Sequence, residues 1–167
     1  MKLTKSLRAI LGISLLIMTL EMKAQASEEI LDGDQKNIPV LVSNENIQFE
    51  YTSPRSSYHC DFVKAETAAI LRKLGATQIF VSCTGGIPYG RTNYVQAQFQ
   101  SLRQTTVDKS TRKAGMTQII LQFHQLCDLH EKIMAELLVG FDVFNYTDSG
   151  VCNFSNGEKG YDFATLL

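Results

Sequence analysis

The chain has 167 residues, of which 16 are Lys or Arg and 17 are Asp or Glu, and 44% of its residues are hydrophobic. This length and apolar content suffice for one domain with a single core. The formal net charge of −1 argues against a general nucleic-acid-binding protein, because such proteins neutralise phosphates with an excess of Lys and Arg.

The first 26 residues have the three parts of a signal peptide. Three basic residues lie within the first eight positions, an apolar run covers Ala9–Leu20, and the small residues of Ala24-Gln25-Ala26 suit a signal peptidase. The apolar run of 12 residues is too short to span a bilayer, which needs about 20. We therefore expect cleavage after Ala26 and an exported protein, periplasmic or secreted, without a transmembrane segment.

Residues 27–45 are expected to form a polar N-terminal arm, and residues 46–167 a single domain. Removal of residues 1–26 leaves 12 Lys and Arg against 16 Asp and Glu, so the mature chain is acidic. This balance again argues against nucleic-acid partners.

The first half of the domain, residues 46–102, is predicted to form a strand, a helix and two further strands. Apolar and polar residues alternate over residues 47–52, which predicts a strand. Apolar residues recur at helical spacing over residues 60–74. Two further strands are predicted over residues 77–83 and 94–102, on either side of a turn-rich segment.

The second half, residues 116–167, repeats this order of elements. A strand is predicted over residues 117–123 and a helix over residues 127–139. Two more strands follow over residues 141–146 and 161–167. A polar, basic linker, residues 103–115, joins the two halves.

A matched Cys-Asp pair supports duplication of one unit. Cys60-Asp61 and Cys127-Asp128 each begin a predicted helix, and another Cys follows 23 or 25 residues later. Two such units predict an α+β fold in which a mainly antiparallel six-stranded sheet carries both helices on one face, a ferredoxin-like sandwich.

The four cysteines all lie in the predicted mature chain, and an even number in an oxidising compartment predicts disulfides. In a strand-helix-strand crossover, the start of the helix lies at the sheet edge where the second strand ends. Cys60 and Cys127 begin the helices, whereas Cys83 and Cys152 end or follow the next strands. We therefore predict the pairs Cys60–Cys83 and Cys127–Cys152.

The signal peptide and three segments of the domain resemble small exported proteins of Gram-negative bacteria, especially Legionella-like species, that have no clear assigned function. The segments are HCDF (59–62), LGATQIFVSCTGG (74–86) and LCDL (126–129). None of them is a known catalytic signature, so the resemblance implies no site residues.

An enzyme is an alternative interpretation of the same residues. An exported hydrolase or thiol enzyme would use His59 or His124 with Cys60, Cys83 or Cys127. No Ser-His-Asp, nucleophile-elbow or paired-carboxylate signature occurs, so the sequence favours a non-catalytic protein.

The spacing of His124, Cys127 and His130 resembles a metal-binding motif. On a helix, however, His124 and His130 would diverge by about 240° around the axis. We expect surface histidines that flank a disulfide, and neither a metal nor another cofactor.

Six glutamines are predicted to share the sheet face opposite the helices. Glutamine donates and accepts hydrogen bonds but does not titrate near neutral pH, so such a face suits recognition of a ligand or a second subunit. A solvated sheet face is the alternative. The six residues are Gln48, Gln96, Gln98, Gln100, Gln118 and Gln122.

The linker carries four basic residues against one acid, Asp108. Such a positive patch would hold a phosphate or an anionic headgroup, and a solvated loop is the alternative. Its basic residues are Arg103, Lys109, Arg112 and Lys113.

These features together predict an exported, disulfide-stabilised, non-catalytic binding or interaction protein, with a secreted effector as one such role. Its partner is expected to be an unknown protein or a small anionic ligand, and exposed edge strands would support a homodimer. The alternatives are the enzyme described above and a module that binds anionic ligands or phosphoinositides through the linker.

Overall fold

The computed structural model of the chain describes residues 38–52, 58–88, 90, 92–106, 112–124, 126–152 and 157–167. The predicted signal peptide lies outside these residues, as do residues 27–37 of the predicted arm. Within the described part, no helix is long and apolar enough to cross a membrane.

The first half of the chain forms one helix and an antiparallel sheet with the strand order β2-β3-β1-β4. Its elements are β1 (Ile38–Thr52), α1 (Cys60–Lys73), β2 (Thr77–Gly85), β3 (Thr92–Gln104) and the short β4 (Arg112–Ala114). Because β1 begins at Ile38, residues 38–45 of the predicted arm belong to this sheet.

The second half forms a separate antiparallel sheet with the strand order β5-β7-β6. Its elements are β5 (Met116–Phe123), α2 (Cys127–Leu137), the 3₁₀ turn η1 (Leu138–Gly140), β6 (Val143–Val151) and β7 (Glu158–Leu166). The predicted helices and strands of both halves are therefore present, with somewhat different ends.

The two halves repeat one topology, as the sequence predicts, and we call them the first unit (β1, α1, β2, β3) and the second unit (β5, α2, β6, β7). In each unit the third strand lies between the first two and is antiparallel to both. The first and second strands are therefore parallel, and the helix crosses from one to the other.

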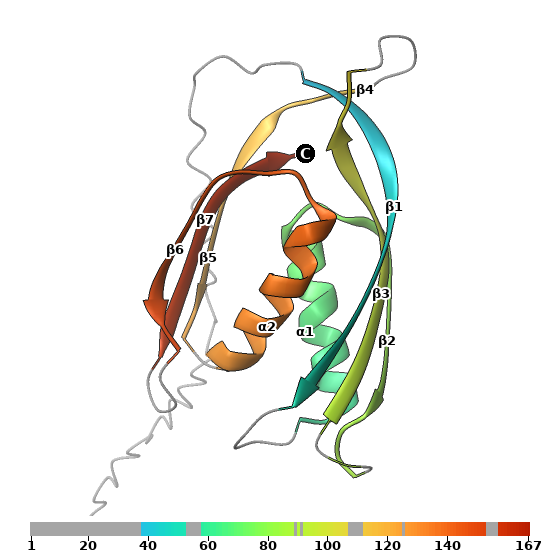
Figure 1. Ribbon diagram of the computed structural model, residues 1–167, viewed down its shortest axis with the longest axis vertical. Helices are drawn as coiled ribbons and strands as arrows, with labels where there is room; N and C mark the ends of the chain where they lie inside the picture. Colours follow the sequence, from blue (N-terminus) through green and yellow to red (C-terminus); the bar gives the residue numbers. More distant parts are fainter. Residues whose placement is uncertain are drawn as a thin grey trace, which may run out of the picture.

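The two units pack face to face, with both helices between the two sheets (Figure 1). The α+β class is confirmed. The prediction of one six-stranded sheet with both helices on one face is wrong, since the strands form sheets of four and three strands. The ferredoxin-like sandwich requires a single sheet and is therefore not the arrangement found here.

Two features explain why the sheets stay apart. β4 lies in the segment predicted as a linker and pairs with Ile38–Val40 of β1, so it covers one end of the edge that β5 would need. The buried residues of α2 also cover a wide arc, about 160° at 100° per residue. A helix with so wide an apolar arc needs cover on two sides, and the two sheets provide it.

Residues at both ends of α1 stabilise the helix termini. Nδ1 of His59 accepts a hydrogen bond from the backbone N–H of Asp61 (3.4 Å). Asp61 lies in the first turn, whereas Arg72 and Lys73 lie in the last, which suits the helix dipole at both ends. Gly75 then adopts a φ of +80°, which glycine tolerates, and the helix ends close to the predicted position.

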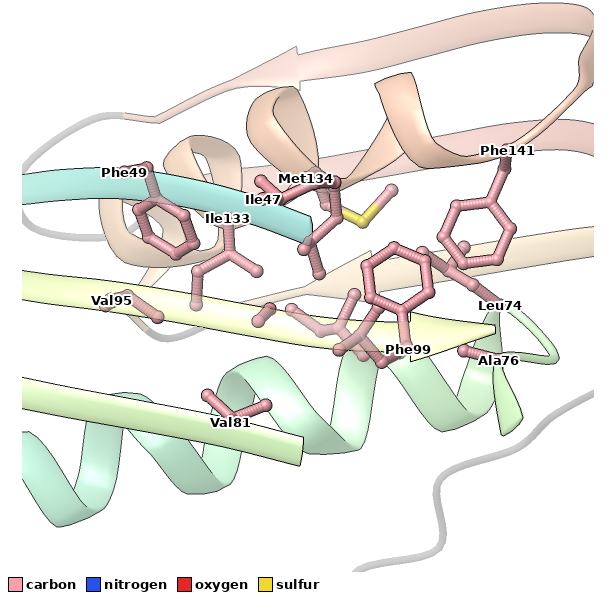
Figure 2. Close-up of a cluster of buried hydrophobic side chains, with 14 of the residues drawn as sticks. Ile47, Phe49, Leu74, Ala76, Val81, Val95, Phe99, Ile133, Met134 and Phe141 are labelled. Atoms are coloured by element: carbon pink, nitrogen blue, oxygen red, sulfur yellow. The ribbon is translucent and has the colours of Figure 1, made fainter. Parts of the chain in front are cut away.

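One hydrophobic core fills the space between the sheets, and both helices contribute to it (Figure 2). Side chains of the first sheet lie beside those of α2, among them Ile47, Phe49, Val95, Ile133 and Met134. Alternate residues of the strands face the helices and are buried or half-buried in this core: Ile47, Phe49, Ile79, Val81, Val95, Ala97, Phe99, Ile119 and Leu121.

Truncation of Met134 tests the central position of α2. Met134 is 0% exposed, so Met134→Ala should leave a cavity and lower the free energy of unfolding by about 2–5 kcal/mol. Urea denaturation of the oxidised protein measures this change. Val139→Ala is the control, because Val139 is 68% exposed and its truncation should change the free energy by less than about 0.5 kcal/mol. Equal losses in both variants would contradict the assignment.

Candidate functional site

The outer face of the four-stranded sheet carries uncharged polar side chains in a regular array. Gln96, Gln98 and Gln100 of β3 point away from the helices, because the residues that alternate with them are buried. Further amides lie opposite on β1, in the pairs Gln48–Gln96, Asn46–Gln98 and Asn44–Gln100. We call these six side chains the amide face.

Hydrogen bonds between β1 and β3 orient the amide face. Nε2 of Gln100 donates to Oδ1 of Asn44 directly opposite (3.0 Å), and Nε2 of Gln96 donates to Oδ1 of Asn46 on the diagonal (3.3 Å). Each primary amide has two donor hydrogens and an acceptor oxygen with two lone pairs. The amide face is therefore partly ordered in advance and keeps donors and acceptors for a ligand.

Two exposed aromatic rings lie on the same side of the sheet. Tyr94 of β3 is 51% exposed, and Phe80 of β2, opposite Gln98, is 61% exposed. An open depression of about 450 Å³ crosses the three strands beside Tyr94, and Glu50 is the one carboxylate among its described lining residues. These residues are Gln48, Phe49, Glu50, Ser82, Thr84, Tyr94, Val95 and Gln96.

Tyr94 was not among the binding residues that the sequence indicates, although a signal was present. Its even position in an alternating strand places it on the same face as Gln96 and Gln98. Alternation alone could not show that a depression forms beside it, because the depression also needs Ser82 and Thr84 from the neighbouring strand.

The six predicted glutamines do not share one face. Gln118 and Gln122 are exposed on β5 of the other sheet, where Nε2 of Gln118 donates to Oδ1 of Asp162. Because the two sheets face each other across the helices, their outer faces point in opposite directions. The prediction of a single glutamine surface is therefore wrong, and the four glutamines of β1 and β3 remain together.

Arg103 of β3 points towards the second unit. Its Nε lies 3.3 Å from Oε1 of Glu45, and its Nη1 lies 3.1 Å from Oδ1 of Asp142. Its Nη2 donates to the backbone carbonyl of Val139 (2.7 Å). Asp142 also accepts a hydrogen bond from the backbone N–H of Gln104 (2.5 Å). Arg103 thus joins the two units.

Arg103 is not available to the predicted basic patch, because two carboxylates already bind its guanidinium. Arg112 and Lys113 are exposed on β4. Lys109 lies outside the described residues. Two described basic side chains therefore remain for the expected anion site.

The disulfides Cys60–Cys83 and Cys127–Cys152 are both present, with 5.5 Å between the Cα atoms of each pair. These are the predicted pairs. The four cysteines all lie within the described residues and none is free, so the structure offers no thiolate to a catalytic His59 or His124.

The histidines of the HxxCxxH motif lie in different environments. His124 is exposed, and its Nδ1 lies 3.0 Å from Oε1 of Glu158. His130 is buried, stacks on Phe123, and its Nε2 lies 2.9 Å from Oε2 of Glu66 in α1. The expectation of a surface position for His130 is wrong, because both sides of α2 are covered. Across the described ranges, no three His, Cys, Asp or Glu side chains are grouped to hold a metal ion.

A charged cluster lies between α2 and the second sheet. The side chain of Lys159 is 11% exposed, and its Nζ lies 2.6 Å from Oδ2 of Asp148 and 3.7 Å from Oε1 of Glu131. The hydrogen bond with Asp148 raises the pKa of Lys159. The nearby hydroxyl of Tyr161 is buried without a hydrogen-bond partner in the described part, and burial, aided by Glu131, raises the pKa of Tyr161.

Comparisons with protein-family models, curated proteins and solved structures found no match. The resemblance to small exported Gram-negative proteins therefore stays a prediction.

Replacement of Arg103 distinguishes a contact between the units from an anion site. Arg103→Gln should lower the free energy of unfolding by about 1–3 kcal/mol, because Glu45, Asp142 and the Val139 carbonyl lose their partner. Lys113→Gln, on the exposed β4, should change it by less than about 0.5 kcal/mol. Urea denaturation measures both, and the same small effect in both variants would refute this role of Arg103.

Tyr161 should make stability sensitive to alkaline pH. Its pKa is raised in the folded protein, so above the ordinary value of about 10 the unfolded chain loses the proton first. The free energy of unfolding should therefore be fully retained below about pH 10 and should fall as the pH rises further. Urea denaturation from pH 8 to 11 measures this fall.

Tyr161→Phe should reduce the alkaline loss, because the phenol that titrates is removed. Tyr94→Phe is the matched control, since Tyr94 is 51% exposed. An unchanged alkaline profile in Tyr161→Phe would show that other groups cause the loss.

Proposed function

We propose that this protein is an exported, disulfide-stabilised, non-catalytic binding protein that recognises a neutral oligosaccharide through the amide face. The observation that carries the proposal is the depression beside Tyr94, which combines amide and hydroxyl side chains with an exposed aromatic ring. We infer that the protein acts in the periplasm or outside the cell.

Export is supported by two independent features. The first 26 residues have the basic, apolar and small-residue parts of a signal peptide. The four cysteines are paired in two disulfides, which persist in oxidising compartments.

The chemistry of the amide face matches that of a sugar. Hydroxyl groups both donate and accept hydrogen bonds, as do the amides of Gln48 and Gln96 and the hydroxyls of Ser82 and Thr84. The C–H faces of a pyranose ring are apolar and stack on aromatic side chains such as Tyr94. A Tyr ring offers an apolar face together with a polar hydroxyl.

The spacing of the rings suggests a chain of sugars rather than a single one. Tyr94 lies four residues along β3 from Gln98, and Phe80 lies opposite Gln98 on β2. Strand geometry places the Cα atoms of Tyr94 and Phe80 roughly 14 Å apart. An extended oligosaccharide of about three units would span this distance, with the amides beneath it.

The charges near the depression favour binding of a neutral ligand without hydrolysis. Glu50 is the one carboxylate among the described residues of its lining, whereas glycoside hydrolysis commonly uses a pair of carboxylic acids. A carboxylate beside Tyr94 also disfavours an anionic ligand. The thiol-enzyme alternative lacks a free thiol, and the anionic-ligand alternative loses Arg103.

A glycan array of neutral and acidic oligosaccharides, followed by calorimetric titration of the best neutral binder, tests the proposal. Tyr94→Ala should weaken that binding roughly 5- to 30-fold, because a stacking surface is lost. Tyr94→Phe should retain most of the affinity, since it keeps the ring.

Two further variants locate the site. Gln96→Ala should weaken binding, whereas Gln122→Ala, an exposed glutamine of the other sheet, should leave it unchanged. Binding of acidic sugars alone, an array without any neutral binder, or full affinity in Tyr94→Ala would each refute the proposal.

A further inference from the structure

Most open strand edges in the described part carry features that discourage pairing with another chain. β1 extends beyond the short β4 from Leu41 to Thr52, and this stretch contains the charged Glu45 and Glu50. β2 has a register shift with Gln78 at a φ of +50°, and β6 has one with Asn145 at a φ of +53°. β4 is three residues long, and two of these are basic. Irregular backbone, short length and positive charge are common means of protecting a sheet edge.

β5 has none of these features. Its register with β7 runs without a shift from Met116 opposite Leu166 to Phe123 opposite Lys159. Its eight residues, MTQIILQF, include no charged residue, Pro or Gly. In the described part of the chain, β5 pairs with β7 alone and leaves its other edge open.

We propose that β5 pairs with β5 of a second copy of this chain, in an antiparallel arrangement about a two-fold axis. The two three-stranded sheets would then join into one six-stranded sheet across the dimer. The proposal stands apart from oligosaccharide binding, which uses the other sheet.

The sequence of β5 is complementary to itself in such a pair. With the axis at Ile120, Ile120 lies opposite Ile120, and Gln118 lies opposite Gln122 on the outer face. On the inner face Ile119 lies opposite Leu121. The central pairs thus match apolar with apolar and amide with amide, Thr117 lies opposite Phe123, and no charges are brought together.

The side chains of β5 also favour a dimer in which this edge is covered. Met116 and Ile120 are 46% and 47% exposed on the outer face of β5. An uncharged run of β-branched and apolar residues at an open edge promotes uncontrolled association. A closed dimer would cover it, and the outermost strands of the joined sheet would be the two copies of β6, whose edge is irregular.

The expected dimer is of moderate affinity. A junction of two eight-residue strands is small beside stable interfaces, which bury about 1,200–2,000 Å² in total. We therefore expect a dissociation constant in the micromolar range.

Sedimentation of the oxidised mature protein from about 1 to 500 µM tests the proposal. The expected result is a monomer–dimer equilibrium in the native protein and a monomer in Ile120→Lys, because the two lysines would meet at the axis. Val151→Lys is the matched control, since Val151 is 67% exposed on the other edge strand of the same sheet.

Disulfide cross-linking through an introduced cysteine tests the same dimer if Ile120→Lys folds poorly. Ile120→Cys should form a disulfide-linked dimer under mild oxidation, whereas Val151→Cys should not. A native protein that is monomeric throughout the range would overturn the proposal, as would dimers that are lost in Val151→Lys or trapped by Val151→Cys.

Discussion

Apolar side chains of α2 are buried against both sheets at once, and this packing positions everything else. Leu129, Ile133, Met134 and Leu137 are all 0% exposed. Because two sheets are needed to cover them, the units lie face to face and each sheet turns its other side outward. The amide face is outward-facing for this reason, and its residues take no part in the core.

Polar contacts between the units also specify how the units are oriented relative to each other. Oη of Tyr51 in β1 donates to Oδ2 of Asp128 in α2 (2.7 Å), and Glu66 of α1 binds His130 of α2. Arg103 makes the third contact, through Asp142. Loss of one member of a partly buried pair leaves the other without its partner, so these contacts penalise other relative positions of the units. Asp128, whose place in the first turn of α2 suits the helix dipole, therefore also orients its unit.

The local structure could be predicted because it depends on neighbours in sequence. Alternation identified the inward residues of β1 and β3, and the positions of the cysteines at helix starts and after strands identified both disulfides. Alternation shows which residues share the face of a strand but not which sheet the strand joins, so Gln118 was grouped with Gln96. Arg103 was misassigned for a related reason: Glu45 and Asp142 lie 58 and 39 residues away in the chain, and only the packed units bring them to it.

The two disulfides join cysteines that are consecutive along the chain, the first with the second and the third with the fourth. In a chain that enters an oxidising compartment N-terminus first, Cys83 and Cys152 would each meet their native partner as the nearest free thiol already present. Oxidation in order of arrival would then give the native connectivity, and thiol–disulfide exchange to correct mispaired cysteines would not be required. Each unit would be covalently closed before the next is complete, and biogenesis would need an oxidant rather than an isomerase.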